Sequence, residues 1–283
     1  MSTAAVFFSL LAGACFALSW ALQHRAARRE PNYHVGDPRL LLRLLRRPGW
    51  LIGRLLAVAG VVAQAMALRH GALSGVQPLM LTGVVFAVPL SAWLDRRATP
   101  RGQLTAVLYG SAGLAAFLVA ASPEPGTTRP STANWVVVFA LCGGFVLLLL
   151  IAAGRRAGPA RATLVGVATG TLFGLSAALL KADAVHLGDG LSSVLTEWTL
   201  YAWVVVCVVA LVLNQNAFQG TTLAAPLTGL ALSEPLVALA IGVGAFDERL
   251  QFDGPRLLLV AIGVVAMVIG VWRLSPDLSA AET

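Results

Sequence analysis

The sequence predicts an all-α polytopic membrane protein with nine transmembrane helices in two inverted repeats. Three observations predict this fold class: nine long apolar stretches, a charged fraction of only 12%, and basic residues concentrated in alternate loops. A helix needs about 20 mostly apolar residues to cross the hydrocarbon core of a bilayer. The stretches are continuous rather than alternating, which favours a helical bundle over a β-barrel.

The nine predicted spans follow one another with mostly short connections. In chain order they are Ala4–Leu22, Trp50–Leu68, Ala72–Leu94, Gln103–Ala121, Asn134–Ala153, Ala162–Leu180, Val194–Leu213, Gly220–Phe246 and Pro255–Trp272. Most tryptophans fall near the end of a span, where an amphipathic ring prefers the interface between lipid and water.

The first stretch, Ala4–Leu22, is interpreted as a span rather than a signal peptide. No basic segment precedes it, and its apolar run has the full length of a span. In the loop that follows, the arginines between Pro38 and Pro48 share one helical face and the leucines share the other. This pattern predicts an interfacial amphipathic helix near 38–48, although the segment could also continue the second span.

The basic residues predict the topology. Of the 20 Lys and Arg residues, 14 fall in the odd-numbered loops and the C-terminal tail, 5 fall in the even-numbered loops, and Arg54 lies inside a span. The positive-inside rule then places the N-terminus outside and the C-terminus in the cytoplasm, in the cell (inner) membrane. The net charge of +7 is therefore a topology signal and not evidence of nucleic-acid binding.

Several kinds of chemistry are not expected. Cys15, Cys142 and Cys207 are scattered within spans and have no metal-binding spacing. The chain has no His-Glu-x-x-His motif, no phosphate-binding loop and no paired intramembrane aspartates. We therefore expect no enzymatic activity and no cofactor, and the sequence leaves any metal site unknown.

The chain repeats itself in inverted orientation. Segments around Ala67 and Leu73 match segments around Ala217 and Leu223, and an Asp-x-Arg-x4-Gly motif recurs at an offset of 152 residues, at Asp95–Gly102 and Asp247–Gly254. By the charge bias, the first motif lies at the inner surface and the second at the outer surface. Two halves are predicted, 1–132 with four helices and 133–273 with five, followed by a disordered tail at 274–283. Inverted repeats are typical of secondary transporters, whose binding site lies between the halves.

A stripe of glycines marks the sixth span. Gly166, Gly170 and Gly174 recur every four residues and so share one face of the helix. Small residues on one face let another helix approach closely, and we interpret the stripe as a packing surface rather than a substrate contact.

Glu234 is the carboxylate predicted nearest the middle of the bilayer, and Pro235 follows it. A buried charge in lipid is costly, and proline frees a backbone carbonyl one turn earlier. This combination predicts a substrate or coupling-ion site, with a structural hydrogen bond from Glu234 as the alternative.

Other polar residues of the spans are weaker candidates for the same site. Gln64 occupies a place in the first half that matches Asn214 and Asn216 in the second, so these amides could bind a polar substrate or could join helices to one another. Glu197 is expected near the outer interface. Lys181 and Asp183, at the outer end of the sixth span, are expected to pair or to reach the interface.

The chain resembles the drug/metabolite transporter superfamily, of the EamA-like kind. The resemblance rests on a span proline followed by a terminal acidic-Arg pair and a Gly-led span, as in Pro235 to Gly254 and in Pro78 to Gly102. It is most similar to the NIPA-type branch, which has nine spans and a polar basic end to its first span, here Leu22–Arg25. The branch implies magnesium transport, whereas the small number of intramembrane carboxylates favours an organic solute.

The sequence thus predicts a secondary transporter or facilitator that moves a small polar solute by alternating access. The alternatives are a NIPA-type transporter of magnesium or another divalent cation, and a non-transporting membrane scaffold. The expected partners are the lipid bilayer, a small solute or cation, and a second copy of the chain in a homodimer; no nucleic acid is expected.

Overall fold

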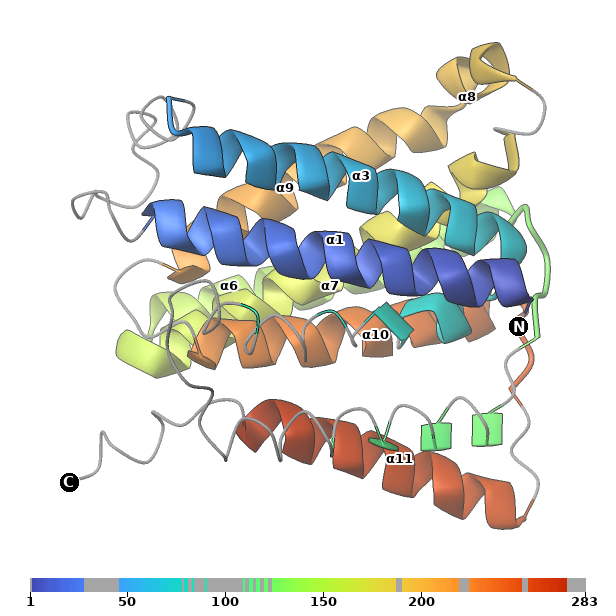
Figure 1. Cartoon of the computed structure of the whole chain (residues 1–283). Coiled ribbons are helices and arrows are strands. Elements are labelled where there is room, and N and C mark those ends of the chain that lie inside the picture. The colour runs from blue at the N-terminus through green and yellow to red at the C-terminus, as the bar shows by residue number, and fades with distance from the viewer. Residues whose placement is uncertain are drawn as a thin grey trace.

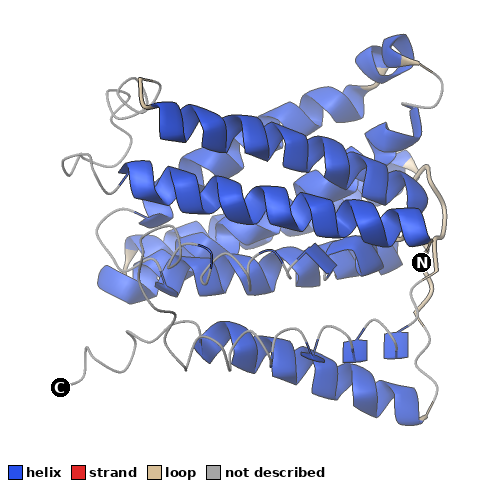
Figure 2. Ribbon diagram, viewed as in Figure 1, coloured by secondary structure: helices blue, strands red, loops and turns tan. Residues whose placement is uncertain are grey.

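The computed structural model describes most of the chain. The described residues are 2–27, 46–77, 79–80, 83, 90, 109, 112–113, 116–117, 120–121, 124–186, 190–218, 224–250 and 254–273. Regular secondary structure within these ranges is entirely helical (Figure 2), apart from one isolated antiparallel bridge between Glu124 and Arg249. The predicted all-α fold class is therefore confirmed.

Several predicted features lie outside the described residues. These are most of the interfacial helix near 38–48, the first copy of the repeated motif at Asp95–Gly102, Pro78, and the tail at 274–283.

Eight helices have defined bounds, and we keep the labels of Figure 1 for them. They are α1 (Thr3–Ala27), α3 (Pro48–His70), α6 (Thr132–Gly154), α7 (Gly158–His186), α8 (Leu191–Thr196), α9 (Trp198–Phe218), α10 (Ala224–Phe246) and α11 (Pro255–Arg273). Local signals explain several ends: proline begins α3 and α11, where its missing N–H is not needed. The Ser131 side chain caps α6 by accepting a hydrogen bond from the Asn134 N–H at 3.1 Å.

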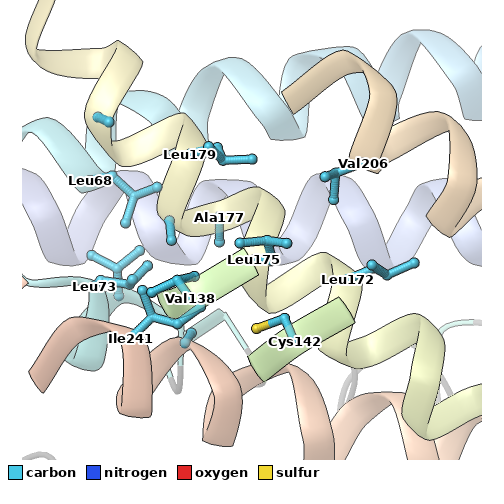
Figure 3. Close-up of a cluster of buried hydrophobic side chains, with 14 of the residues drawn as sticks. Leu68, Leu73, Val138, Cys142, Leu172, Leu175, Ala177, Leu179, Val206 and Ile241 are labelled. Atoms are coloured by element: carbon cyan, nitrogen blue, oxygen red, sulfur yellow. The ribbon is translucent and has the colours of Figure 1, made fainter. Parts of the chain in front are cut away.

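Helix α7 lies at the centre of the bundle. It packs along α10 and α9 and also contacts α6 and α3, while α1 and α3 run side by side (Figure 1). The largest cluster of buried apolar side chains surrounds α7 (Figure 3) and includes Leu175 and Leu179 of α7, Leu68 of α3, Cys142 of α6 and Ile241 of α10. Burial on all sides explains why α7 is rich in small residues.

The crossing of α7 and α10 brings the two backbones into close contact. A Cβ atom at Gly170 would lie 2.6 Å from the Leu230 carbonyl oxygen and would also meet the Ser233 hydroxyl. A Cβ atom at Gly174 would lie 2.8 Å from the Glu234 carbonyl oxygen. Two members of the predicted glycine stripe therefore lie directly against α10, and the third, Gly166, is buried on the same helix.

The outside of the bundle is apolar. Exposed leucine, valine, isoleucine and phenylalanine side chains cover much of α6, α9 and α11, including Leu148, Val205 and Leu258. Among the described residues, four helices are long and apolar enough to cross a membrane, at Thr3–Gln23, Pro48–His70, Thr132–Gly154 and Ala160–His186. Such a surface would aggregate in water, so these features indicate a membrane protein.

Candidate functional site

A buried ion pair lies at one end of the bundle, which we call the Glu248 end. The Glu248 carboxylate accepts hydrogen bonds from the backbone N–H groups of Leu73 (2.5 Å) and Ser74 (2.8 Å), where a helical segment begins, and from the Lys181 ammonium group. The Lys181 and Glu248 side chains are 3% and 0% exposed. One carboxylate therefore joins α7, the segment after α10 and the helical segment that begins at Leu73.

The end of α10 directs Glu248 into the bundle. The helix ends at Phe246, and Asp247 has a φ of 52°, a left-handed conformation that Asp tolerates better than most residues. The chain reverses there, and the Glu248 N–H donates to the Gly242 carbonyl at 3.0 Å. A side chain at position 242 would meet the Glu248 carboxylate, so glycine is required for this arrangement.

Aromatic rings cover the ammonium group of Lys181. Its Nζ atom lies 4.6 Å from the centre of the Phe246 ring, a favourable cation–π distance. Phe246 packs edge-to-face on Trp135, whose ring in turn packs edge-to-face on Trp198. The burial of the Lys181 and Glu248 side chains strengthens the attraction between their charges.

A second polar cluster lies beside the ion pair, where α7, α8 and α9 meet. The Thr199 hydroxyl donates a hydrogen bond to Asp183 Oδ1, whereas Asp183 Oδ2 is buried and has no hydrogen-bond partner among the described residues. One turn further along α7, His186 Nε2 lies 3.7 Å from Glu197 Oε1. The Ser193 hydroxyl donates to the His186 carbonyl at 2.7 Å and fastens α8 to the end of α7.

Two further polar atoms near Leu73 are buried without a hydrogen-bond partner among the described residues. They are Ser74 Oγ and Gln77 Nε2, on residues that are 0% and 2% exposed. Ser74 and Gln77 are three residues apart and therefore share one face of their helical segment.

The predicted mid-bilayer residues lie away from the Glu248 end. Glu234 and Pro235 lie inside α10, where Glu234 is partly buried and its backbone carbonyl contacts Gly174. Gln64 is buried in α3, and Asn214 in α9 has a buried Oδ1 without a hydrogen-bond partner among the described residues. No described contact joins Gln64 to Asn214, and the side chain of Asn216 lies outside the described part of the chain.

The sequence interpretation placed the end of the sixth span too early. The predicted span ended at Leu180, whereas α7 continues to His186, so Lys181 and Asp183 lie within the helix and are buried. Lys181 pairs with Glu248 and not with Asp183. The sequence patterns did not single out Glu248, and its position directly after an apolar span is the signal that could have identified it.

Comparison with known proteins assigns no function to this site. The chain is 26% identical to an uncharacterized protein of Corynebacterium glutamicum over 276 residues, which cover 96% of this chain and 94% of that protein. No family model and no solved structure matches the chain.

Proposed function

We propose that this protein is a secondary transporter or facilitator with nine transmembrane helices in two inverted halves. It moves a small polar solute across the cell membrane by alternating access, as the resemblance to the drug/metabolite transporter superfamily implies. In this proposal the Glu248 end faces outward, in agreement with the distribution of basic residues in the loops.

The main support for this proposal is a contact in which each of two glycines lies against the backbone of the other. A Cβ atom at Gly113 would lie 2.6 Å from the Gly263 carbonyl oxygen and 2.7 Å from the Met267 nitrogen. A Cβ atom at Gly263 would lie 2.7 Å from the Gly113 carbonyl oxygen and 2.8 Å from the Phe117 nitrogen. Gly113 and Gly263 are 150 residues apart, the same offset that separates Ala67 from Ala217. Two inverted halves are related by a pseudo-two-fold axis. At such an axis a residue of one half is expected to contact the equivalent residue of the other half, and the two halves make the same contacts in both directions.

A second pair of crossings supports the same symmetry. In the first half, a Cβ atom at Gly13 of α1 would lie 3.1 Å from the Met80 carbonyl oxygen and 3.2 Å from the Gly83 nitrogen. In the second half, Gly170 of α7 meets α10 at Leu230 in the same manner. By the offset of the predicted repeat, α1 corresponds to α7 and the helical segment at Met80 corresponds to α10, and both crossings are made close by the absence of a side chain.

The ion pair between Lys181 and Glu248 suits an alternating-access cycle. It joins elements of both halves at the proposed outer end, because the segment beginning at Leu73 belongs to the first half and α7 and α10 belong to the second. An opening at this end would separate these groups. We therefore propose that this structure represents a state closed to the outside.

The proposed solute site lies at mid-depth between the halves, with Glu234, Pro235, Gln64 and Asn214 as its candidate residues. Glu234 would contact a cationic solute or bind the coupling ion, and the amides would hydrogen-bond to the solute.

Ligand-induced stabilisation followed by uptake tests this function. The purified full-length protein should be heated with panels of small organic solutes and of divalent metal ions, because a ligand that binds the folded state raises the apparent stability. We expect at least one organic solute to stabilise the protein and to be taken up by reconstituted vesicles. Stabilisation and uptake of magnesium alone would favour the NIPA-type alternative, and the absence of both effects across the panels would favour a scaffold.

The topology is tested by reporter fusions. Reporters placed after Thr283 and within the loop 122–131 should report opposite compartments, with the C-terminal fusion in the cytoplasm. Reports from the same compartment would contradict the nine-span arrangement.

Replacement of the mid-bilayer carboxylate tests the proposed solute site. Glu234→Gln keeps the shape of the side chain but removes its charge and its ability to titrate. The variant should insert and fold like the wild type, yet lose uptake that responds to pH or depends on a cationic solute. Asp247→Asn, which removes an exposed carboxylate, is the matched control. If uptake by Glu234→Gln keeps the pH response and the cation dependence of the wild type, Glu234 has only a structural role.

A further inference from the structure

The buried charges at the Glu248 end do not balance. Among the described residues, the charged side chains of the buried core are Lys181, Asp183 and Glu248, whose residues are 3%, 4% and 3% exposed. Two of them are acidic and one is basic. This excess of one negative charge is energetically costly, because a charge removed from water needs a partner of opposite charge.

Lys181 is fully engaged by Glu248. Its ammonium group donates to Glu248 Oε1 and lies over the Phe246 ring, and it forms no described ion pair with Asp183. Lys181 and Asp183 are two residues apart on α7, a spacing at which helical side chains do not face each other. Asp183 therefore forms no ion pair with a basic side chain among the described residues.

The hydrogen bonds of Asp183 leave one oxygen free. Oδ1 accepts from the Thr199 hydroxyl, and Oδ2 is buried with no hydrogen-bond partner among the described residues. One neutral donor does not compensate a full negative charge in a buried site. The carboxyl group is stable in this environment when it carries a proton or binds a cation.

The surroundings favour a proton over a metal ion. Within the described part of the chain, no group of three or more His, Cys, Asp or Glu residues is arranged to hold a metal ion. A hard cation requires several oxygen ligands, whereas a proton requires only the one free oxygen that Asp183 provides.

Two titratable side chains near Asp183 are partly exposed at the end of the bundle. His186 lies one turn along α7 towards the end of the bundle, and Glu197 lies between α8 and α9, with side chains that are 14% and 34% exposed. Both interact electrostatically with Asp183. The described titratable or charged groups at this end are Lys181 and His186 of α7, Glu197 beside α9, Arg69 and His70 at the end of α3, Asp247, Glu248 and Arg249 after α10, and Glu124, whose backbone pairs with that of Arg249. A histidine ring can bind a proton at one nitrogen and release another from the second, which suits His186 as the intermediate.

We propose that Asp183 is a proton-binding site of this protein and that it exchanges its proton with the outer solution through His186 and Glu197. The assignment of this end of the bundle to the outer solution rests on the function proposed above.

Infrared titration of the purified full-length protein tests the site without any solute. A protonated carboxyl group has a carbonyl stretching band that a carboxylate lacks. The wild type should show such a band at low pH that disappears on titration to alkaline pH, and one component of it should be missing from Asp183→Asn. Asp247→Asn should retain this component. Bands of equal intensity in the wild type and in Asp183→Asn would overturn the proposal.

Thermal unfolding provides a second measurement on the same variants. Since the folded protein holds a proton that the unfolded chain releases, the Tm of the wild type should fall as the pH is raised above the range in which carboxyl groups ordinarily titrate. Asp183→Asn should show a smaller fall than the wild type and the control. An identical dependence in all three proteins would contradict the proposal.

A nearly isosteric change at the neighbouring residue keeps the proposal testable if Asp183→Asn does not fold. Thr199→Val removes the hydroxyl that donates to Asp183 Oδ1, and this donor favours the ionised carboxylate. The infrared band of this variant should therefore persist to higher pH than in the wild type, and an unchanged midpoint would overturn the proposal. Normal titration without uptake of any solute would refute transport and leave the proton site intact.

Discussion

Glu248→Ala should be among the most destabilising single substitutions at the Glu248 end. It leaves the Lys181 ammonium group buried without its counter-charge and removes the acceptor of the Leu73 and Ser74 N–H groups. Removal of one partner from a buried ion pair costs about 3–5 kcal/mol. The expected result is a large loss of thermal stability in detergent, or failure to accumulate in the membrane, measured against Asp247→Asn as the control.

A double variant separates the charge from the hydrogen bonds. Glu248→Gln keeps an oxygen that can accept from a backbone N–H but leaves Lys181 unpaired. Addition of Lys181→Met removes the unpaired ammonium charge while keeping an unbranched side chain of similar length. The double variant should therefore be more stable than Glu248→Gln alone. If the two proteins are equally stable, the ion pair does not determine the stability of this end.

Gly170→Leu should have an effect of similar size at the crossing of α7 and α10. Even its Cβ atom would lie 2.6 Å from the Leu230 carbonyl oxygen and would collide with the Ser233 hydroxyl. Backbone atoms cannot move aside without separating the helices, and overpacking of a well-packed core typically costs about 1–3 kcal/mol or more. Loss of folded protein or of thermal stability is expected, as measured by size-exclusion chromatography and thermal unfolding.

Gly143→Leu is the matched control for this substitution. Gly143 lies on the exposed surface of α6, and a Cβ atom there would have no neighbour within 4 Å. The same change should therefore leave stability close to that of the wild type. Comparable loss of stability in both variants would show that the effect comes from the larger side chain itself and not from the crossing.

Several helices and their ends were predictable from sequence because hydropathy is a local property. The predicted spans Asn134–Ala153 and Pro255–Trp272 differ by at most two residues at either end from α6 and α11. The glycine spacing on α7 likewise predicted a packing face without reference to a partner. Each of these inferences depends only on neighbours along the chain.

The tertiary structure decided which elements meet, and therefore how the polar residues are paired. Sequence placed Lys181 and Asp183 at the same helix end, which made a pair between them or exposure at the interface the natural expectation. The structure instead joins Lys181 to Glu248, 67 residues away, and leaves Asp183 with Thr199. The physical reason is that apolar composition determines whether a segment enters lipid, whereas a buried charge takes whichever partner the packed helices bring near. Such partners come from distant parts of the chain, and no local pattern identifies them.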